Sequence, residues 1–225
     1  MKRFTLYILL LFGLLTAQAQ ANYQVSVADR QRIVTGSQSF QKDDREIMAN
    51  ALMWAIERGG QLKELITDID YEKMRFTMDY NIIREGQSSF AAKLTIQVGQ
   101  GRMVYLVNNI KGQTSGFSGM LGAAIFDKMS PEKKPKQKIM IEEFESANKK
   151  ELLSLFEYIN YHNKRLEHWN SIIENRIEKG MDVDDVTLIL GKPIDIQKSG
   201  ETTQYMYNTF TYVFFENGEV KSFMQ

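Results

Sequence analysis

Apolar residues recur at helical spacing in two long stretches of the chain. The first, at about 43–58, follows a pair of aspartates suited to capping a helix and stops at Gly59 and Gly60. Its apolar positions are Ile47, Ala51, Trp54 and Ala55. The second runs from 141 to Ile177 without glycine or proline. Its spacing of three and four predicts one helix of about nine turns or two helices with a kink near 160–163, and we expect the single helix.

Alternating apolar and polar residues predict strands over 65–70, 75–83, 90–98 and 102–110. Turns at 84–87 and 99–101, each containing glycine, separate the last three of these segments. An earlier strand is centred on Ile33 and Val34, with a bend at Gly36 and Ser37. The simplest packing for this half of the chain is one helix on an antiparallel sheet.

The C-terminal part repeats this mixture on a smaller scale. Gly180 ends the long helical pattern, and the pair Asp182 and Asp185 predicts a capped short helix that stops near Gly191. Strands are expected over 194–198, 203–207 and 210–215, and a hairpin at 216–219 returns the chain through 220–223. The predicted fold class is α+β, with two small domains, each an antiparallel sheet packed with helices, joined by a long helix. We expect the domains to cover 22–169 and 170–225.

The first 21 residues have the order of a secretory signal peptide. Lys2 and Arg3 precede an apolar run over 6–15, and small residues follow at 17, 19 and 21. The apolar run is shorter than the roughly 20 residues that a membrane-spanning helix needs. We therefore expect cleavage near Ala19 or Ala21 and a mature protein that is periplasmic or secreted.

Composition narrows the chemistry. The chain has no cysteine, which excludes disulfides, thiolate metal sites and the thioether lipid anchor of a lipoprotein. The 28 basic residues balance 28 acidic ones, so no basic excess points to nucleic acid. No phosphate-binding or dinucleotide-binding motif occurs, and we expect no cofactor.

A glycine-rich segment at 112–138 is the most unusual part of the sequence. It surrounds four apolar residues that are candidates for contact with a partner: Phe117, Met120, Leu121 and Phe126. Clustered apolar residues often mark interaction sites when they are exposed. They are also compatible with a cover packed on the sheet, or with peripheral contact to a membrane.

The titratable residues do not form a recognisable active site. His162 and His168 are six residues apart, which places them on different faces of a helix, and the apolar stripe predicts an interior or half-buried His162. The acidic residues fit helix capping or a solvated strand edge better than a calcium loop or a carboxylate pair. These residues are Asp68, Asp70, Glu72, Asp182, Asp184 and Asp185. We expect no catalytic residue, no metal site and no enzymatic activity.

The last fifty residues resemble the SmpA/OmlA (BamE-like) fold. The resemblance rests on a Gly-Met pair, a short helix ending in Leu-Gly-Lys-Pro, a tyrosine strand and a Phe-Glu-Asn-Gly hairpin. The residues concerned are Gly180, Met181, Gly191, Pro193, Tyr207, Phe215, Asn217 and Gly218. Their roles are structural, and the resemblance implies a fold whose members include proteins that act by binding other proteins.

The region before them resembles a family of exported bacterial domains of unknown function with a TATA-box-binding-protein-like fold. The residues that carry this resemblance are the helix segment around Trp54, a strand pair at 75–83 and the strand containing Arg102 and Tyr105. We therefore expect an exported, non-enzymatic binding or assembly protein of the bacterial envelope with a protein partner. The alternatives are a small-ligand or lipid binder with a cleft near the glycine-rich segment, and a hydrolase using carboxylates and His162.

Overall fold

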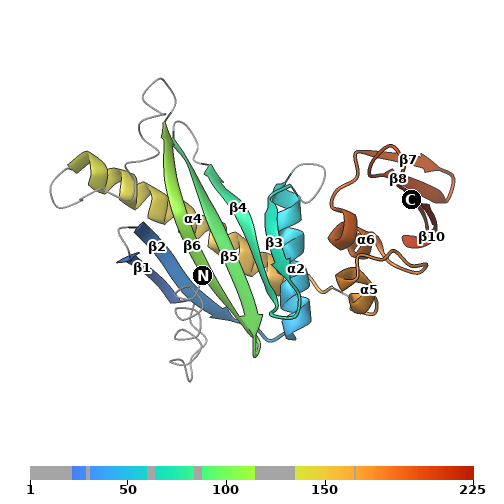
Figure 1. Ribbon diagram of the computed structural model, residues 1–225, viewed down its shortest axis with the longest axis horizontal. Helices are drawn as coiled ribbons and strands as arrows, with labels where there is room; N and C mark the ends of the chain where they lie inside the picture. The colour runs from blue at the N-terminus through green and yellow to red at the C-terminus, as the bar shows by residue number, and fades with distance from the viewer. Residues whose placement is uncertain (1–21, 29–30, 60–63, 84–87, 115–134, 165) are drawn as a thin grey trace. The chain divides into compact units, whose positions relative to one another are not determined.

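The computed structural model describes residues 22–28, 31–59, 64–83, 88–114, 135–164 and 166–225 (Figure 1). Within these residues it contains two antiparallel sheets and four helices, which confirms the α+β fold class. The chain divides into two compact units. The first combines the described residues up to Asp44 with those of Asp79–Phe156, and the second combines Arg45–Met78 with Glu157–Gln225. The expected boundary between 169 and 170 stays a prediction.

The larger sheet has six strands in the order β1-β2-β6-β5-β4-β3. Its strands are β1 (Asn22–Ala28), β2 (Gln31–Ser39), β3 (Ile66–Asp70), β4 (Arg75–Ile83), β5 (Ser88–Gly99) and β6 (Arg102–Thr114). The four strands predicted between 65 and 110 are therefore present. β1 is an additional strand that we did not predict, although Tyr23, Val25 and Val27 alternate with polar residues.

Helix α4 (Pro135–Tyr161) packs against this sheet within the first unit. Its Phe144 ring lies 5.4 Å from Phe90, and its Phe156 ring lies 5.9 Å from Tyr105. The face that α4 covers is lined by buried alternate residues of the inner strands, including Val34, Leu94, Ile96, Met103 and Val107. The middles of these strands are buried at every position, over 34–37, 94–96 and 103–107, so burial there is not confined to the face under α4.

Gly36 lies inside β2, so the expected bend at Gly36 and Ser37 is wrong. The reason is a close approach of neighbouring strands, because a β-carbon at position 36 would overlap the carbonyl oxygen of Asn22 and the hydroxyl group of Tyr105. That hydroxyl donates a hydrogen bond to the same carbonyl over 2.9 Å. Glycine is thus required here to let Tyr105 reach β1.

In the second unit, α2 (Asp44–Arg58) is buried around its whole circumference between Ile47 and Ile56. Two polar contacts hold it to the residues at the end of α4. The Asn50 amide donates to the backbone carbonyl of His162 over 3.0 Å, and the Tyr158 hydroxyl donates to the Glu57 carboxylate over 2.8 Å. Long-range hydrogen bonds of this kind fix the position of a helix more specifically than apolar packing alone.

The single helix expected through Ile177 is wrong, and the break falls at the kink that the alternative interpretation placed near 160–163. α4 ends at Tyr161, and the next helix, α5 (Trp169–Ile173), is short. The helix ends here because the His162 carbonyl accepts a hydrogen bond from the Asn50 amide. Two residues later, the side chain of Lys164 points inward and forms a buried ion pair with Asp185. Neither partner is visible in the local sequence.

The smaller sheet follows α6 (Val183–Leu190) and has the order β10-β9-β8-β7. Its strands are β7 (Asp195–Ser199), β8 (Thr202–Met206), β9 (Tyr212–Glu216) and β10 (Glu219–Met224). The predicted meander and its final hairpin are confirmed, with Glu216 paired to Glu219 across the turn.

Candidate interaction surface

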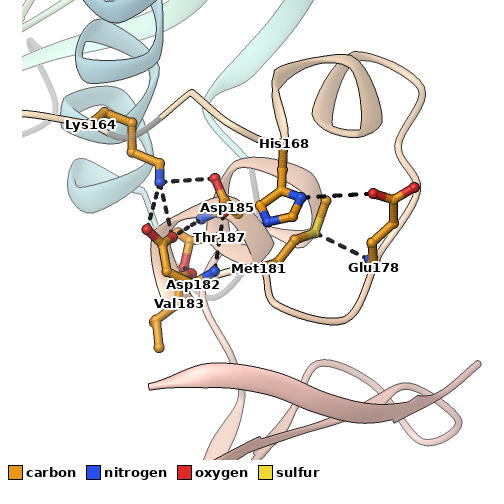
Figure 2. Close-up of polar contacts among 8 residues, drawn as sticks. All are labelled: Lys164, His168, Glu178, Met181, Asp182, Val183, Asp185 and Thr187. Atoms are coloured by element: carbon orange, nitrogen blue, oxygen red, sulfur yellow. Dashed lines mark hydrogen bonds and ion pairs between the residues drawn. The ribbon is translucent and has the colours of Figure 1, made fainter. Parts of the chain in front are cut away.

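A cluster of three charged residues fixes the start of α6, with Lys164 and Asp185 buried and Asp182 half-buried (Figure 2). The amino group of Lys164 lies 2.9 Å from both carboxylate oxygens of Asp182 and 2.9 Å from Oδ1 of Asp185. The two aspartates also form the predicted capping box. The Asp182 carboxylate accepts from the Asp185 backbone N–H over 2.7 Å, and the Asp185 carboxylate accepts from the Asp182 N–H over 3.1 Å.

These contacts give the cluster a structural role. Each carboxylate is shared between a backbone N–H group and the lysine, which compensates for part of the cost of burying charge. The pKa of the neighbouring Asp184 carboxyl is raised, first by partial burial and then by the charge of Asp182, although part of the residue is exposed. Among the described residues, no group of three potential ligands is arranged to hold a metal ion.

The two histidines have different environments, and neither takes part in this cluster. His162 is exposed, with its ring stacked 3.8 Å from that of Tyr158, so the expected interior position is wrong. The cause is the end of α4 at Tyr161, which ends the apolar stripe before His162. His168 is half-buried, and its Nδ1 lies 3.7 Å from Oε2 of Glu178 (Figure 2).

The residues that carry the BamE-like resemblance occupy turns and core positions. Positive φ angles occur at Gly180 (88°), Gly191 (83°), Asn217 (54°) and Gly218 (83°). Left-handed backbone of this kind is easiest for glycine and asparagine. Met181, Tyr207 and Phe215 are buried, and Pro193 is half-buried. All of these positions serve the scaffold of the small sheet.

Trp54, which carries the TATA-box-binding-protein-like resemblance, is buried in α2. The guanidinium carbon of Arg58 lies 3.8 Å from the centre of its ring, a cation–π contact one helical turn away.

Two of the acidic residues expected at a strand edge, Asp68 and Asp70, form ion pairs there, and Glu72 lies in the turn after β3. Lys73 hydrogen-bonds to the Asp70 carboxylate and lowers its pKa, and Arg75 lies within 4 Å of both Asp68 and Asp70. Asp68 and Asp70 are thus paired with basic side chains at the surface, as is usual for charged residues on an exposed strand edge.

The four partner-contact candidates predicted from sequence, Phe117, Met120, Leu121 and Phe126, lie outside the described residues. Their role stays a prediction.

The small sheet presents a different apolar surface. Side chains alternate between the two faces of each strand. On β9, Val213 and Phe215 point to the buried face, and Tyr212 and Phe214 point to the outer face. Pairing places Met206, Tyr212 and Met224 opposite one another in a single row. We call Met206, Tyr212, Phe214 and Met224 the outer apolar cluster.

The composition of this face departs from that of a solvated sheet. A face exposed to water normally carries polar residues at alternate positions. Here Met224 is 55% exposed and the other three members of the outer apolar cluster are half-buried. Among the described residues, five of the nine exposed large apolar side chains lie in the last 32 residues: Ile194, Ile196, Phe210, Phe223 and Met224. Only Met224 belongs to the outer apolar cluster, because Ile196 and Phe223 are in register with Val213 on the opposite face. Phe210, in the turn before β9, is 75% exposed.

The sequence contains a signal for this surface. Tyr212, Val213, Phe214 and Phe215 form an uninterrupted apolar run, so a strand there has apolar side chains on both faces. Which of them face outward follows only from the register of β9 against its neighbours.

Comparison with models of protein families, with curated proteins and with solved structures gives no match to this chain. The two fold-family resemblances therefore stay predictions. The described helices include none that is long and apolar enough to cross a membrane.

Proposed function

We propose that the chain is an exported, non-enzymatic binding or assembly protein of the bacterial envelope that acts through protein–protein contact. The observation that carries this proposal is the outer apolar cluster on the small sheet. Its four members come from three adjacent strands, so they form one continuous surface instead of scattered exposed residues. Continuous exposed apolar surface is a recognised mark of interaction sites.

The residue types suit a protein partner. Tyrosine, phenylalanine and methionine are enriched at the centres of protein interfaces. Methionine adapts its shape to a partner because its side chain is unbranched and polarisable. Burying each large apolar side chain contributes about 1.5–3 kcal/mol, and micromolar binding requires about 8 kcal/mol. Three of the four members are already half-buried, so the outer apolar cluster supplies only part of this free energy and the partner must bury further surface around it.

The envelope assignment is supported by the leader pattern, and the binding role by the BamE-like resemblance of the last fifty residues. Both are sequence arguments. Intact-mass analysis of the protein recovered from the producing cells tests the first. We expect a mass that corresponds to removal of the residues up to Ala19 or Ala21, and the full-length mass would contradict export with cleavage.

Site-specific photo-cross-linking tests the binding role. A photoreactive phenylalanine analogue replaces Phe214 in one variant and the exposed Glu167 in a control variant, and both are irradiated in the native envelope. We expect a discrete cross-linked partner from position 214 only. The Tyr212→Ser substitution should abolish that product, and Gln204→Ser, a polar change on the same face, should leave it intact. Equal labelling from both positions, or no product, would count against the proposal.

A further inference from the structure

The two sheets have four edge strands, and three of them carry features that oppose pairing with another chain. β3 has Asp68 and Asp70, β7 has Asp195 and Lys198, and both residues that flank Val220 on β10 are charged. β3 and β10 also contain register shifts typical of bulges. Charges and bulges are the usual protection of exposed strand edges.

β1, at the edge of the larger sheet beside β2 (Figure 1), has none of these features. Its sequence, Asn-Tyr-Gln-Val-Ser-Val-Ala, has no charged residue and no proline. It pairs with β2 over seven consecutive residues without a register shift. Within the described sheet, β2 is its single neighbour. A regular, uncharged edge of this length is a template for an added strand.

The side chains of β1 alternate strictly. Tyr23, Val25 and Val27 share one face, and Asn22, Gln24 and Ser26 share the other. Tyr23 faces α4, since the Asn148 amide donates to its hydroxyl over 3.3 Å and the Lys149 amino group lies 4.7 Å from its ring centre. Val27, further along the same face, is 61% exposed.

The polarity of β1 is symmetric about Val25. An antiparallel second copy centred on this residue pairs Val25 with itself, Tyr23 with Val27, and Gln24 with Ser26. Apolar residues then meet apolar residues on one face, and Gln24 meets Ser26 on the other, while the terminal pair joins Asn22 to Ala28. Among registers that keep the two faces aligned, this one alone pairs all seven residues.

The hydrogen bond from Tyr105 and the close packing at Gly36 hold the first residues of β1 against the sheet before any partner arrives. A preorganised edge loses little conformational entropy on pairing. Two-fold pairing of β1 also limits the assembly to two copies, because each copy has a single β1 edge and the dimer occupies both.

We propose that β1 is a homodimer interface, in which two copies of the chain pair antiparallel about Val25 and join their six-stranded sheets. This goes beyond the proposed function, because it concerns contact of the chain with itself and uses residues of the first unit only. A strand from a different protein is the competing occupant.

Sedimentation of the exported, purified protein is the first test. We expect the mass of a dimer at about 100 µM, and at least a tenfold weaker association for Val27→Asp, which places a carboxylate opposite Tyr23 of the second copy. Because Val27 is largely exposed, the variant should keep the circular dichroism spectrum of the parent. A parent protein that is monomeric at this concentration would overturn the proposal. It would do so even if β1 pairs with a strand of a different protein.

Cross-linking then tests the register, and the absence of native cysteine makes it specific. Val25→Cys should give a linked dimer rapidly with a short bismaleimide, because the two thiols face each other across the two-fold axis. Ile196→Cys, at the exposed edge of β7, is the control and should link only slowly. A dimer in which Val25→Cys links no faster than Ile196→Cys would refute pairing about Val25.

Discussion

The amino group of Lys164 lies 2.9 Å from Oδ1 of Asp185, and the two side chains are only 2% and 3% exposed. Together with Asp182, this pair ties the segment after α4 to the first turn of α6. A buried pair of this kind is no guarantee of high stability, because desolvation offsets much of the attraction. Removal of one partner is different, since it leaves the other charge buried and unpaired.

Lys164→Met should therefore destabilise the protein strongly. We expect the free energy of unfolding to fall by about 3 kcal/mol, because Asp182 and Asp185 would lose their shared cation. Lys221→Met is the matched control, since the Lys221–Glu216 ion pair is largely exposed and is worth about 1 kcal/mol at most. Urea unfolding followed by circular dichroism measures both. Equal losses in the two variants would contradict the structural role of the buried cluster.

Gly36→Ala should detach β1 from its neighbours. The new methyl group would overlap the Asn22 carbonyl and the Tyr105 hydroxyl, so one strand must move. We expect a loss of about 2–3 kcal/mol and faster amide exchange in β1. Gly200→Ala is the control, because a β-carbon there meets no atom within 4 Å and only the backbone conformation at φ 61° opposes it. Hydrogen exchange that changes equally in both variants would argue against the close approach at Gly36.

Local chemistry explains what the sequence predicts correctly. The Asp182–Asp185 capping box, the Gly191 helix end and the hairpin at Asn217 and Gly218 each depend on residues within three or four positions of one another. The strands other than β1 follow from period-two alternation in the same way. Such features are visible in one sequence because their partners are adjacent.

The remaining features depend on distant partners. Lys164 looks like a surface lysine until Asp182 and Asp185 fold over it, 18 and 21 positions later. Gly36 resembles a turn residue because the Tyr105 ring that requires it lies on another strand. The outer apolar cluster likewise depends on the pairing register of three strands. These misses reflect tertiary contacts, to which propensity and periodicity are insensitive.

Gly218→Ala should show the energetic effect of backbone conformation alone. Gly218 has φ 83°, and a β-carbon there would meet no atom within 4 Å. We expect a loss of about 1 kcal/mol, from the strain of a left-handed alanine in the β9–β10 hairpin. Asn217→Gly, at φ 54°, should change stability by less than about 0.5 kcal/mol, because glycine accepts this conformation readily. Thermal unfolding of the two variants measures both changes. A larger loss of stability for Asn217→Gly than for Gly218→Ala would contradict the role of backbone strain in this hairpin.

Tyr71→Phe should stabilise the protein, and more so in alkali. The Tyr71 hydroxyl is buried without a hydrogen-bond partner among the described residues, and its ring packs edge-on against Trp169 at 5.8 Å, a contact that phenylalanine preserves. Removing an unsatisfied hydroxyl should gain about 1 kcal/mol near neutral pH. Burial also raises the pKa of Tyr71 from 10.0 to about 12. The folded state therefore holds this proton more tightly than the unfolded state does, and the associated stability is complete below pH 10 and is lost as the pH rises toward 12.

The gain from Tyr71→Phe should consequently increase in urea unfolding measured at about pH 11 relative to about pH 7. Tyr161→Phe is the control, because Tyr161 is exposed and its substitution should shift neither midpoint. A gain that is equal at both pH values would show that Tyr71 ionises as easily in the folded protein as in the unfolded chain, which its burial beside Trp169 opposes.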